Sequence, residues 1–284
     1  MVDTLLQGLL LGGLYALFAL GQSLMFGVMR LTNTAQGDFI ILGGFFAISL
    51  VSATGLAPGW ALLLLAPGAF VFGYALQRFV LNGTLGKDPL PSLVVTFGLA
   101  IIIQNLLLEV YSADPRSLDA GALAFDSMSF GIATVGTLPL LTLGVALLAT
   151  MALQALFSYT SLGRSFRAVS DDREAAQLMG IRPYIVYAQA TGIAFVLIAL
   201  AGTLQAMRTT VSPSDGPLLL LFAFEAVIIG GMGSFWGTLL GALLLGISQQ
   251  IGFRFDPGWG IWFGHLMFLL VLLVRPQGLF PKTR

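Results

Sequence analysis

Long apolar stretches with almost no charge recur along the whole chain. About 20 helical residues are needed to cross the hydrocarbon core of a bilayer. Helices satisfy their own backbone hydrogen bonds in lipid, and the alternating pattern of β-barrel strands is not seen. We therefore expect apolar membrane helices over the following segments. They are Leu5–Met29, Phe39–Ala53, Gly59–Val80, Ser92–Tyr111, Gly136–Tyr159, Tyr184–Met207, Leu218–Ile229, Phe235–Gly252 and Trp259–Val274.

The composition places the surface of the chain in lipid. Hydrophobic residues make up 57% of the 284 residues and charged residues only 9%, whereas about a quarter of a soluble domain is charged. We expect an all-α integral membrane protein, a polytopic bundle of about eight or nine helices forming a single transmembrane domain over residues 1–284. The 13 basic and 13 acidic residues cancel, which argues against a nucleic-acid partner.

Two segments, Phe39–Ala53 and Leu218–Ile229, are short for a full span. Each is either a tilted helix or a re-entrant half-helix buried in protein. The sequence also contains a weak internal repeat, which is either an inverted repeat, because an odd number of spans separates its two copies, or a set of chance matches among apolar residues. Trp60, Arg78 and Phe79 recur, in the same order and at the same spacing, as Trp236, Arg254 and Phe255.

The basic residues predict the orientation, because Lys and Arg accumulate in cytoplasmic loops. If the C-terminus is cytoplasmic, so are Arg30, Arg78, Lys87, Arg164, Arg167, Arg173, Arg182, Arg275, Lys282 and Arg284. Arg116, Arg208 and Arg254 then lie outside, with the acidic stretch Asp114–Asp126. We expect an external N-terminus and a cytoplasmic C-terminus.

Few residues are suited to catalysis or metal binding. The chain has no cysteine and one histidine, His265, so we expect no metal site. No nucleophile–base set is visible, and we do not expect an enzyme. A phosphate-binding loop is also missing, since Gly86-Lys87 lacks the upstream glycine of that motif. If transport is driven by ATP, another chain must bind the nucleotide.

The segment from Ser161 to Pro183 is dense in charge and is predicted to be a cytoplasmic loop. Within it, Arg173–Ile181 has the pattern of a short helix. Asp171 and Asp172 lie at its N-terminal end, where negative charge is favourable. Gly180 can end the helix in a left-handed conformation.

The spacing of Glu174, Ala175, Ala176 and Gly180 resembles the cytoplasmic coupling motif of ABC importer permeases. By this resemblance these four residues contact an ATPase, and the two small alanines permit its close approach. The alternative is an ordinary solvated loop.

The resemblance extends over nearly the whole chain, to the branched-chain amino acid ABC transporter permease family. The similar segments are Gly13–Leu17, Asn33–Asp38, Gly230–Ser234 with Gly237 and Gly241, and Arg275–Phe280. The compact length and early first span resemble the H-type permease more than the longer M-type. Thr34 and Gln36 depart from the family, which commonly has an aromatic residue and a histidine there.

This resemblance implies a bacterial inner-membrane importer with a periplasmic N-terminus. An M-type permease, two cytoplasmic ATPases holding ATP and Mg²⁺, and a periplasmic substrate-binding protein would complete it, and this chain would hold no cofactor. The implied substrates are branched-chain and other hydrophobic amino acids; urea, short amides or organic acids are alternatives. An ATPase-independent channel or secondary transporter is a further alternative, which leaves the Glu174–Gly180 spacing unexplained.

Four polar residues are candidates for the substrate pathway. Asn33, Gln36 and Asp38 lie between the first two apolar segments, where they line the pathway or, as we prefer, cap a helix. Glu225 lies inside an apolar helix, where a carboxylate marks a functional site or a hydrogen-bonded structural residue. We expect His265 to form an interhelical hydrogen bond.

The predicted orientation can be tested by cysteine labelling, because the native chain has no thiol. A cysteine at Ser117 should react with an impermeant thiol reagent in intact cells, and one at Ser165 should react only after the cells are opened. The reverse pattern would overturn both the orientation and the positive-inside assignment.

Overall fold

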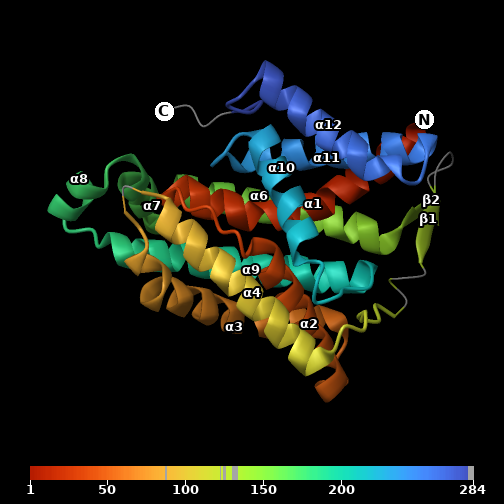
Figure 1. Ribbon diagram of the computed structural model, residues 1–284, viewed down its shortest axis with the longest axis horizontal. Coiled ribbons are helices and arrows are strands. Elements are labelled where there is room, and N and C mark those ends of the chain that lie inside the picture. Colours follow the sequence, from red (N-terminus) through yellow and green to blue (C-terminus); the bar gives the residue numbers. More distant parts are fainter. Residues whose placement is uncertain (87, 122, 124–125, 130–133, 281–284) are drawn as a thin grey trace.

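The computed structural model of the chain describes residues 1–86, 88–121, 123, 126–129 and 134–280 (Figure 1). Lys87, Lys282 and Arg284, three of the predicted cytoplasmic charges, lie outside these ranges. The elements are α1 (Val2–Met29), α2 (Gln36–Thr54), α3 (Pro58–Phe79), η1 (Leu81–Gly83), α4 (Leu90–Tyr111), β1 (Ser127–Ser129), β2 (Thr134–Gly136), α6 (Thr137–Tyr159), α7 (Ser161–Asp171), α8 (Arg173–Leu178), α9 (Pro183–Arg208), α10 (Gly216–Gly230), α11 (Phe235–Phe255) and α12 (Trp259–Val274).

The prediction of a polytopic helical membrane protein is confirmed. Among the described residues, 7 helices are long and apolar enough to cross a membrane, and α10 and α12 are shorter apolar helices. Each predicted apolar segment corresponds to one of these helices. Two elements were not predicted: the antiparallel pair β1–β2 and the helix α7.

The helix α1 forms the centre of the bundle (Figure 1). It packs against α6, α9, α10 and α11, and 83% of the residues in its most apolar 18-residue stretch are buried. In α3 and α4 the corresponding shares are 11% and 17%. The chain therefore surrounds one apolar helix with others whose outer faces remain free to contact lipid.

Glycines let α11 approach α1 closely. A methyl group on Gly12 would lie 2.5 Å from the Cα of Leu243, and one on Gly8 would lie 2.6 Å from the Cα of Ile247. Such spacing favours helix association in membranes, because small residues bring two backbones into contact. The tight packing of α1 on α11 thus depends on the missing Cβ atoms.

The helices from the two ends of the chain are arranged as an inverted repeat. One copy comprises α1, α2 and α3, and the other comprises α9, α10 and α11. α11 lies along α1, and α3 lies along α9, so the third helix of each copy covers the first helix of the other. α1 and α9 run antiparallel, since Arg208 donates to the carbonyl of Leu10 at 3.3 Å and Gly21 lies beside Ala194. The predicted partners Arg78 and Arg254 lie in the last turns of α3 and α11.

The two segments predicted to be short both begin inside the bundle. Gln36, the first residue of α2, donates from Nε2 to the carbonyl of Phe18 in α1 at 3.1 Å. α10 begins beside α2, because a methyl group on Gly37 would overlap the carbonyl of Gly216. α2 has 19 residues and α10 has 15. Both therefore have the interior starting point of a half-helix.

The helix α7 turns part of the predicted charged loop into an amphipathic helix. Its side chains Phe166 and Val169 are buried, and a methyl group on Gly163 would overlap carbonyl groups at the end of α6. The Ser170 hydroxyl donates to the carbonyl of Gly27 at 2.8 Å, joining α7 to α1. The high charge density of the segment obscured this helical spacing of buried residues.

The contact between α1 and α11 predicts a strong effect of one methyl group. Gly12→Ala should destabilise the chain by about 1–3 kcal/mol, because the new Cβ would meet backbone atoms that cannot move aside freely. The measurement is the midpoint of thermal unfolding of the purified chain in detergent. Gly144→Ala is the control, since a Cβ there meets no atom within 4 Å. Equal midpoints for the two variants would contradict the interpretation.

Candidate functional site

The first turns of α2 and α10 meet inside the membrane-embedded bundle. Gly37 and Gly216 lie against one another, and a methyl group on Gly216 would overlap the carboxylate of Asp38. Further along α2, Ser49 forms a hydrogen bond of 2.6 Å with Tyr111 of α4. The first turn of a helix leaves N–H groups without intrahelical partners and carries partial positive charge. Two such ends therefore converge on one interior region.

The three predicted pathway residues between α1 and α2 all lie in this region. Asn33 and Gln36 are fully buried and Asp38 is 3% exposed. The expectation that they cap α2 is wrong, because the N-cap is Ala35 and has no side-chain cap. Asn33 instead accepts the N–H of Ala35 at 3.1 Å in a local turn, while Gln36 binds α1. These side chains thus fix the connection between two helices.

Several buried amide atoms near this connection have no hydrogen-bond partner among the residues that the structure describes. They are Nδ2 of Asn33, Oε1 of Gln36, and both polar atoms of Gln22. Gln22, on α1, was not singled out from the sequence, although an amide in an apolar span is itself a signal. Buried polar groups are normally paired, so this cluster is an exception that calls for a partner.

Glu225 lies elsewhere on α10. It is nine residues beyond Gly216, which corresponds to roughly 13 Å along a helix. Its Oε1 lies 2.5 Å from Nδ1 of His265 on α12, so the predicted interhelical hydrogen bond of His265 is confirmed. Within the described part of the chain, the buried Oε2 atom of Glu225 has no hydrogen-bond partner. The candidate pathway residues therefore form two groups rather than one.

A second polar pair, in which both side chains are buried, crosses the bundle. The Tyr15 hydroxyl donates to Oε1 of Gln249 at 2.6 Å, joining α1 to α11, and the Tyr15 ring lies 4.8 Å from the ring of Phe222 on α10. Neither residue was predicted to be functional. Both pairs are interhelical hydrogen bonds within an apolar surrounding, where a lone polar group would be costly.

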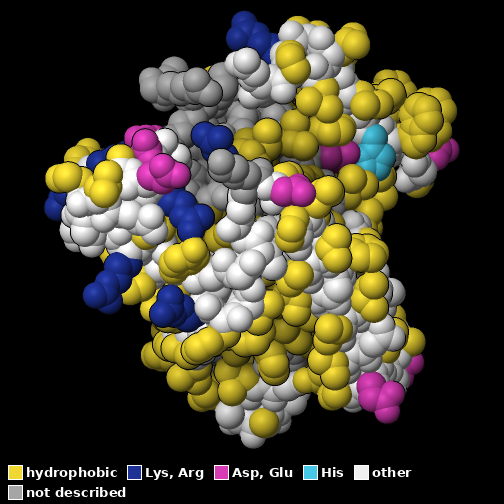
Figure 2. All heavy atoms as spheres, turned by 60° about the vertical axis from the view of Figure 1, so that its left-hand side comes forward, with side chains coloured by type: hydrophobic (Ala, Val, Ile, Leu, Met, Phe, Trp, Pro, Cys, Tyr) yellow, Lys and Arg dark blue, Asp and Glu magenta, His cyan; other side chains and the backbone are white. Residues whose placement is uncertain are grey.

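The basic residues gather at the end of the bundle that carries α7 and α8, which we call the α8 end. In Figure 2 their side chains (dark blue) are grouped around this part of the molecule, whereas apolar side chains (yellow) cover much of the rest. The described members are Arg30, Arg78, Arg164, Arg167, Arg173, Arg182 and Arg275. Arg116, Arg208 and Arg254 lie at the opposite end, so the predicted separation of charge agrees with the fold.

The predicted coupling helix forms at this end as α8. Oδ1 of Asp172 accepts the N–H groups of Glu174 at 2.9 Å and Ala175 at 3.0 Å. Asp171 instead ends α7. Gly180 follows α8 with a φ of 83°, a left-handed conformation that strains residues with a Cβ. The cap and the glycine together define a short, firmly bounded helix.

The two alanines of α8 have different environments. Ala175 is exposed, but Ala176 is only 4% exposed and packs into the chain's own core. The expectation that both alanines admit a partner is therefore wrong for Ala176. The sequence analysis also missed Leu178 and Met179, which are 89% and 83% exposed. Two apolar side chains at the end of a polar helix are a signal that it overlooked.

No group of three or more His, Asp or Glu side chains suited to a metal ion occurs within the described ranges.

The Glu225–His265 pair predicts a double-mutant cycle. His265→Leu leaves the Glu225 carboxyl buried without a partner and should cost about 1–3 kcal/mol of stability. Glu225→Gln keeps a polar partner for His265 and should cost less. The double variant Glu225→Leu/His265→Leu should recover part of the loss, as measured by thermal unfolding in detergent. Strictly additive effects of the two leucines would show that the pair is not coupled.

Comparisons with known proteins identify relatives over almost the entire length. The family described as "Branched-chain amino acid transport system / permease component" matches residues 4–275. The high-affinity branched-chain amino acid transport system permease protein BraD of Pseudomonas aeruginosa is 30% identical over 294 residues, covering 99% of this chain and 96% of BraD.

Two further relatives come from Escherichia coli K12. The permease protein LivH, of a high-affinity branched-chain amino acid transport system, is 28% identical over 297 residues, covering 99% of this chain and 96% of LivH. LivM, with the same description, is 28% identical over 301 residues, covering 95% of this chain but 68% of LivM. The length of this chain therefore agrees with LivH rather than LivM.

A solved structure, PsaBC from Streptococcus pneumoniae in complex with Fab, shares the fold. It has a TM-score of 0.51 and 13% sequence identity, covering 96% of this chain and 92% of that chain. At this identity the likeness concerns the arrangement of helices alone. Because the family match spans residues 4–275 and BraD aligns end to end, this chain belongs to the permease component family of branched-chain amino acid transport systems.

Proposed function

We propose that this chain is the H-type permease subunit of a bacterial ABC importer for branched-chain and other hydrophobic amino acids. The proposal is supported by BraD and LivH, whose names describe permeases of high-affinity branched-chain amino acid transport systems and whose lengths this chain matches. An M-type permease subunit, of which LivM is the longer counterpart in E. coli, would form the other half of the substrate pathway.

ATP hydrolysis belongs to other chains in this proposal. The sequence has no phosphate-binding loop of the Walker A type, so two separate cytoplasmic ATPase subunits would hold ATP and Mg²⁺. A periplasmic binding protein would deliver the amino acid to the other side. The chain would lie in the inner membrane of a bacterial cell. The α8 end of the bundle would then face the cytoplasm, and the N-terminus would face the periplasm.

The single observation that carries the ATPase contact is the geometry of α8. Asp172 caps its first turn through two N–H groups, and Arg173 ties it to α9 through the Tyr184 hydroxyl at 2.6 Å. Its free end presents Leu178 and Met179, which are 89% and 83% exposed. A short helix that is fixed at its first turn can transmit a displacement to α9 while the apolar side chains at its C-terminal end contact a partner.

We assign the substrate pathway to the polar residues of the interior. Asn33, Gln36, Asp38 and Glu225 are buried within the membrane-embedded bundle, and three of them retain unpartnered atoms. Polar groups in lipid-embedded helices are costly and mark substrate paths. Movement of α2 relative to α10, whose first turns touch at Gly37 and Gly216, would expose the groups near that contact to a substrate.

The proposed ATPase contact predicts the effect of charge at the tip of α8. Leu178→Glu combined with Met179→Glu should reduce co-purification of the ATPase subunits at least tenfold, because two apolar anchors of an interface are lost. Uptake of branched-chain amino acids and binding-protein-stimulated ATP hydrolysis in proteoliposomes should fall together. Ala176→Trp is unsuitable for this purpose, since Ala176 is buried within the chain itself.

Phe255→Glu is the control for this experiment. Phe255 is 69% exposed and lies at the end of α11, opposite the α8 end. This variant should retain the ATPases, and all variants should elute as single species in detergent. Normal ATPase association and uptake in the Leu178→Glu/Met179→Glu variant would remove α8 from the contact. Uptake by this chain alone, driven by an ion gradient, would favour a secondary transporter.

A further inference from the structure

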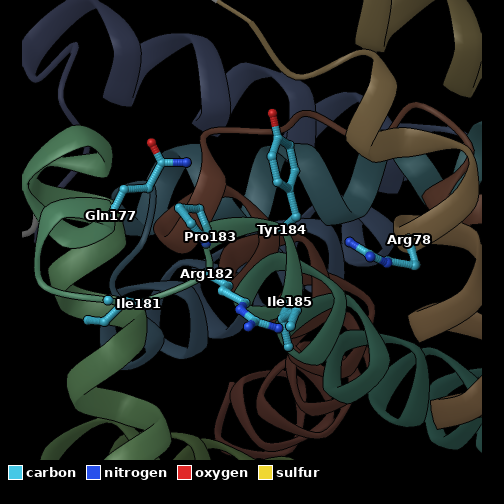
Figure 3. A pocket seen from close by; sticks show the side chains of 8 residues that line it. Arg78, Gln177, Ile181, Arg182, Pro183, Tyr184 and Ile185 are labelled. Atoms are coloured by element: carbon cyan, nitrogen blue, oxygen red, sulfur yellow. The ribbon is translucent and has the colours of Figure 1, made fainter.

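A pocket opens at the α8 end, outside the polar groups of the bundle interior. It has a volume of about 470 Å³ and lies between the end of α3, the end of α8 and the start of α9. Its polar lining consists of Arg78, Gln177, Arg182 and Tyr184. In Figure 3, Arg78 projects from α3 toward α9, Gln177 and Tyr184 extend to one side, and Arg182 lies beside Ile185.

The pocket is electropositive. Within the described ranges, neither Arg78 nor Arg182 lies within ion-pair distance of a carboxylate, because the only such pair there is Glu225–His265. Pro183 opens the 26-residue helix α9 at the pocket wall, which adds the partial positive charge of a helix start. The Tyr184 ring is held by Arg173, whose guanidinium lies 4.9 Å from the ring centre. The pocket thus offers several donors and positive charge without a counter-ion.

The position of the pocket places it at the level of lipid headgroups. Arg78 lies in the last turn of α3 and Pro183 is the first residue of α9, and both helices are long enough to cross a membrane. Tyrosine and arginine side chains at helix ends favour this interface between lipid and water. A ligand in the pocket would therefore be reached from the bilayer as well as from solution.

An apolar stripe on α3 leads to the pocket. Leu64 and Val71 are seven residues apart, and so are Phe72 and Phe79. Seven residues are about two helical turns, so each pair lies in line and the two lines are neighbours on one side of α3. The four side chains are 55%, 65%, 48% and 83% exposed, respectively. The stripe ends at Phe79, the residue after Arg78, at the end of α3 that borders the pocket. This combination of a charged cavity and an adjoining apolar track matches an amphipathic molecule.

We propose that this pocket binds the phosphate of an anionic phospholipid, with an acyl chain lying along the α3 stripe. Guanidinium groups bind phosphate oxygens through paired hydrogen bonds, and basic pockets between helices on the cytoplasmic side bind anionic headgroups. The bound headgroup contacts α3, α8 and α9 at once. It therefore braces the C-terminal end of α8, next to Tyr184, to which Arg173 donates a hydrogen bond.

The test measures lipid retention by the full-length chain with native mass spectrometry. Dioleoylphosphatidylglycerol is the probe and dioleoylphosphatidylcholine is the neutral control. Each arginine near an anionic surface contributes about fivefold to affinity, so Arg78→Gln/Arg182→Gln should weaken retention of the anionic lipid by about 25-fold. Arg164→Gln/Arg167→Gln removes the same charge from α7, outside the pocket, and should retain the lipid.

Further arms separate a lipid from a free phosphate. Phe79→Ser should weaken retention of phosphatidylglycerol, because it removes the apolar side chain at the end of the stripe next to Arg78. Ten-fold excess inorganic phosphate should not displace the lipid; displacement would show that the pocket takes free phosphate and would overturn the lipid assignment. Equal retention of the two lipids, or unchanged retention in Arg78→Gln/Arg182→Gln, would also overturn it.

The pocket could instead be part of the ATPase contact, and the same variants distinguish the two. Loss of ATPase co-purification by Arg78→Gln/Arg182→Gln in detergent, with lipid retention unchanged, would assign the pocket to that contact and reject the lipid proposal. Lipid retention is measured on the chain by itself, so its outcome does not depend on whether the chain transports amino acids.

Discussion

The meeting of α2 and α10 inside the bundle is the constraint on which the rest of the structure depends. The first residues of both helices, Gln36 and Gly216, are buried, and Gly37 and Gly216 allow the two backbones to touch. The surrounding helices must then enclose this region. α1 and α9 do so by running antiparallel on either side, and the glycines that face α11 let the cover close tightly over α1.

A consequence of this arrangement is that polar chemistry is divided between the interior and one end. The buried part of the bundle holds Glu225, which bonds the partly exposed His265, and the amide groups near Gln36. The α8 end holds most of the described arginines and a helix whose base is fixed by Asp172. α9 begins at this end and continues past the interior polar groups. A displacement of α8 can therefore be passed along α9 to those groups.

Hydropathy located the apolar helices because backbone satisfaction in lipid leaves few choices. Local chemistry also located α8, since Asp172 and Gly180 act within a few residues of the helix they bound. Sequence reasoning failed where a side chain's neighbour is distant in the chain. Ala176 was expected to face a partner but packs inward, and Gln36 was expected to cap a helix but donates to the carbonyl of Phe18 in α1.

By itself, the sequence determined that the chain lies in a membrane, where its helices run, that its charges separate to two ends, and which family it resembles. Only the tertiary structure decided which faces are buried and which polar groups meet, such as Glu225 with His265 and Arg78 with Arg182 in one pocket. The physical reason is that lipid tails are as apolar as a leucine-rich helix surface. Hydropathy therefore cannot distinguish an apolar side chain in contact with lipid from one in contact with another helix.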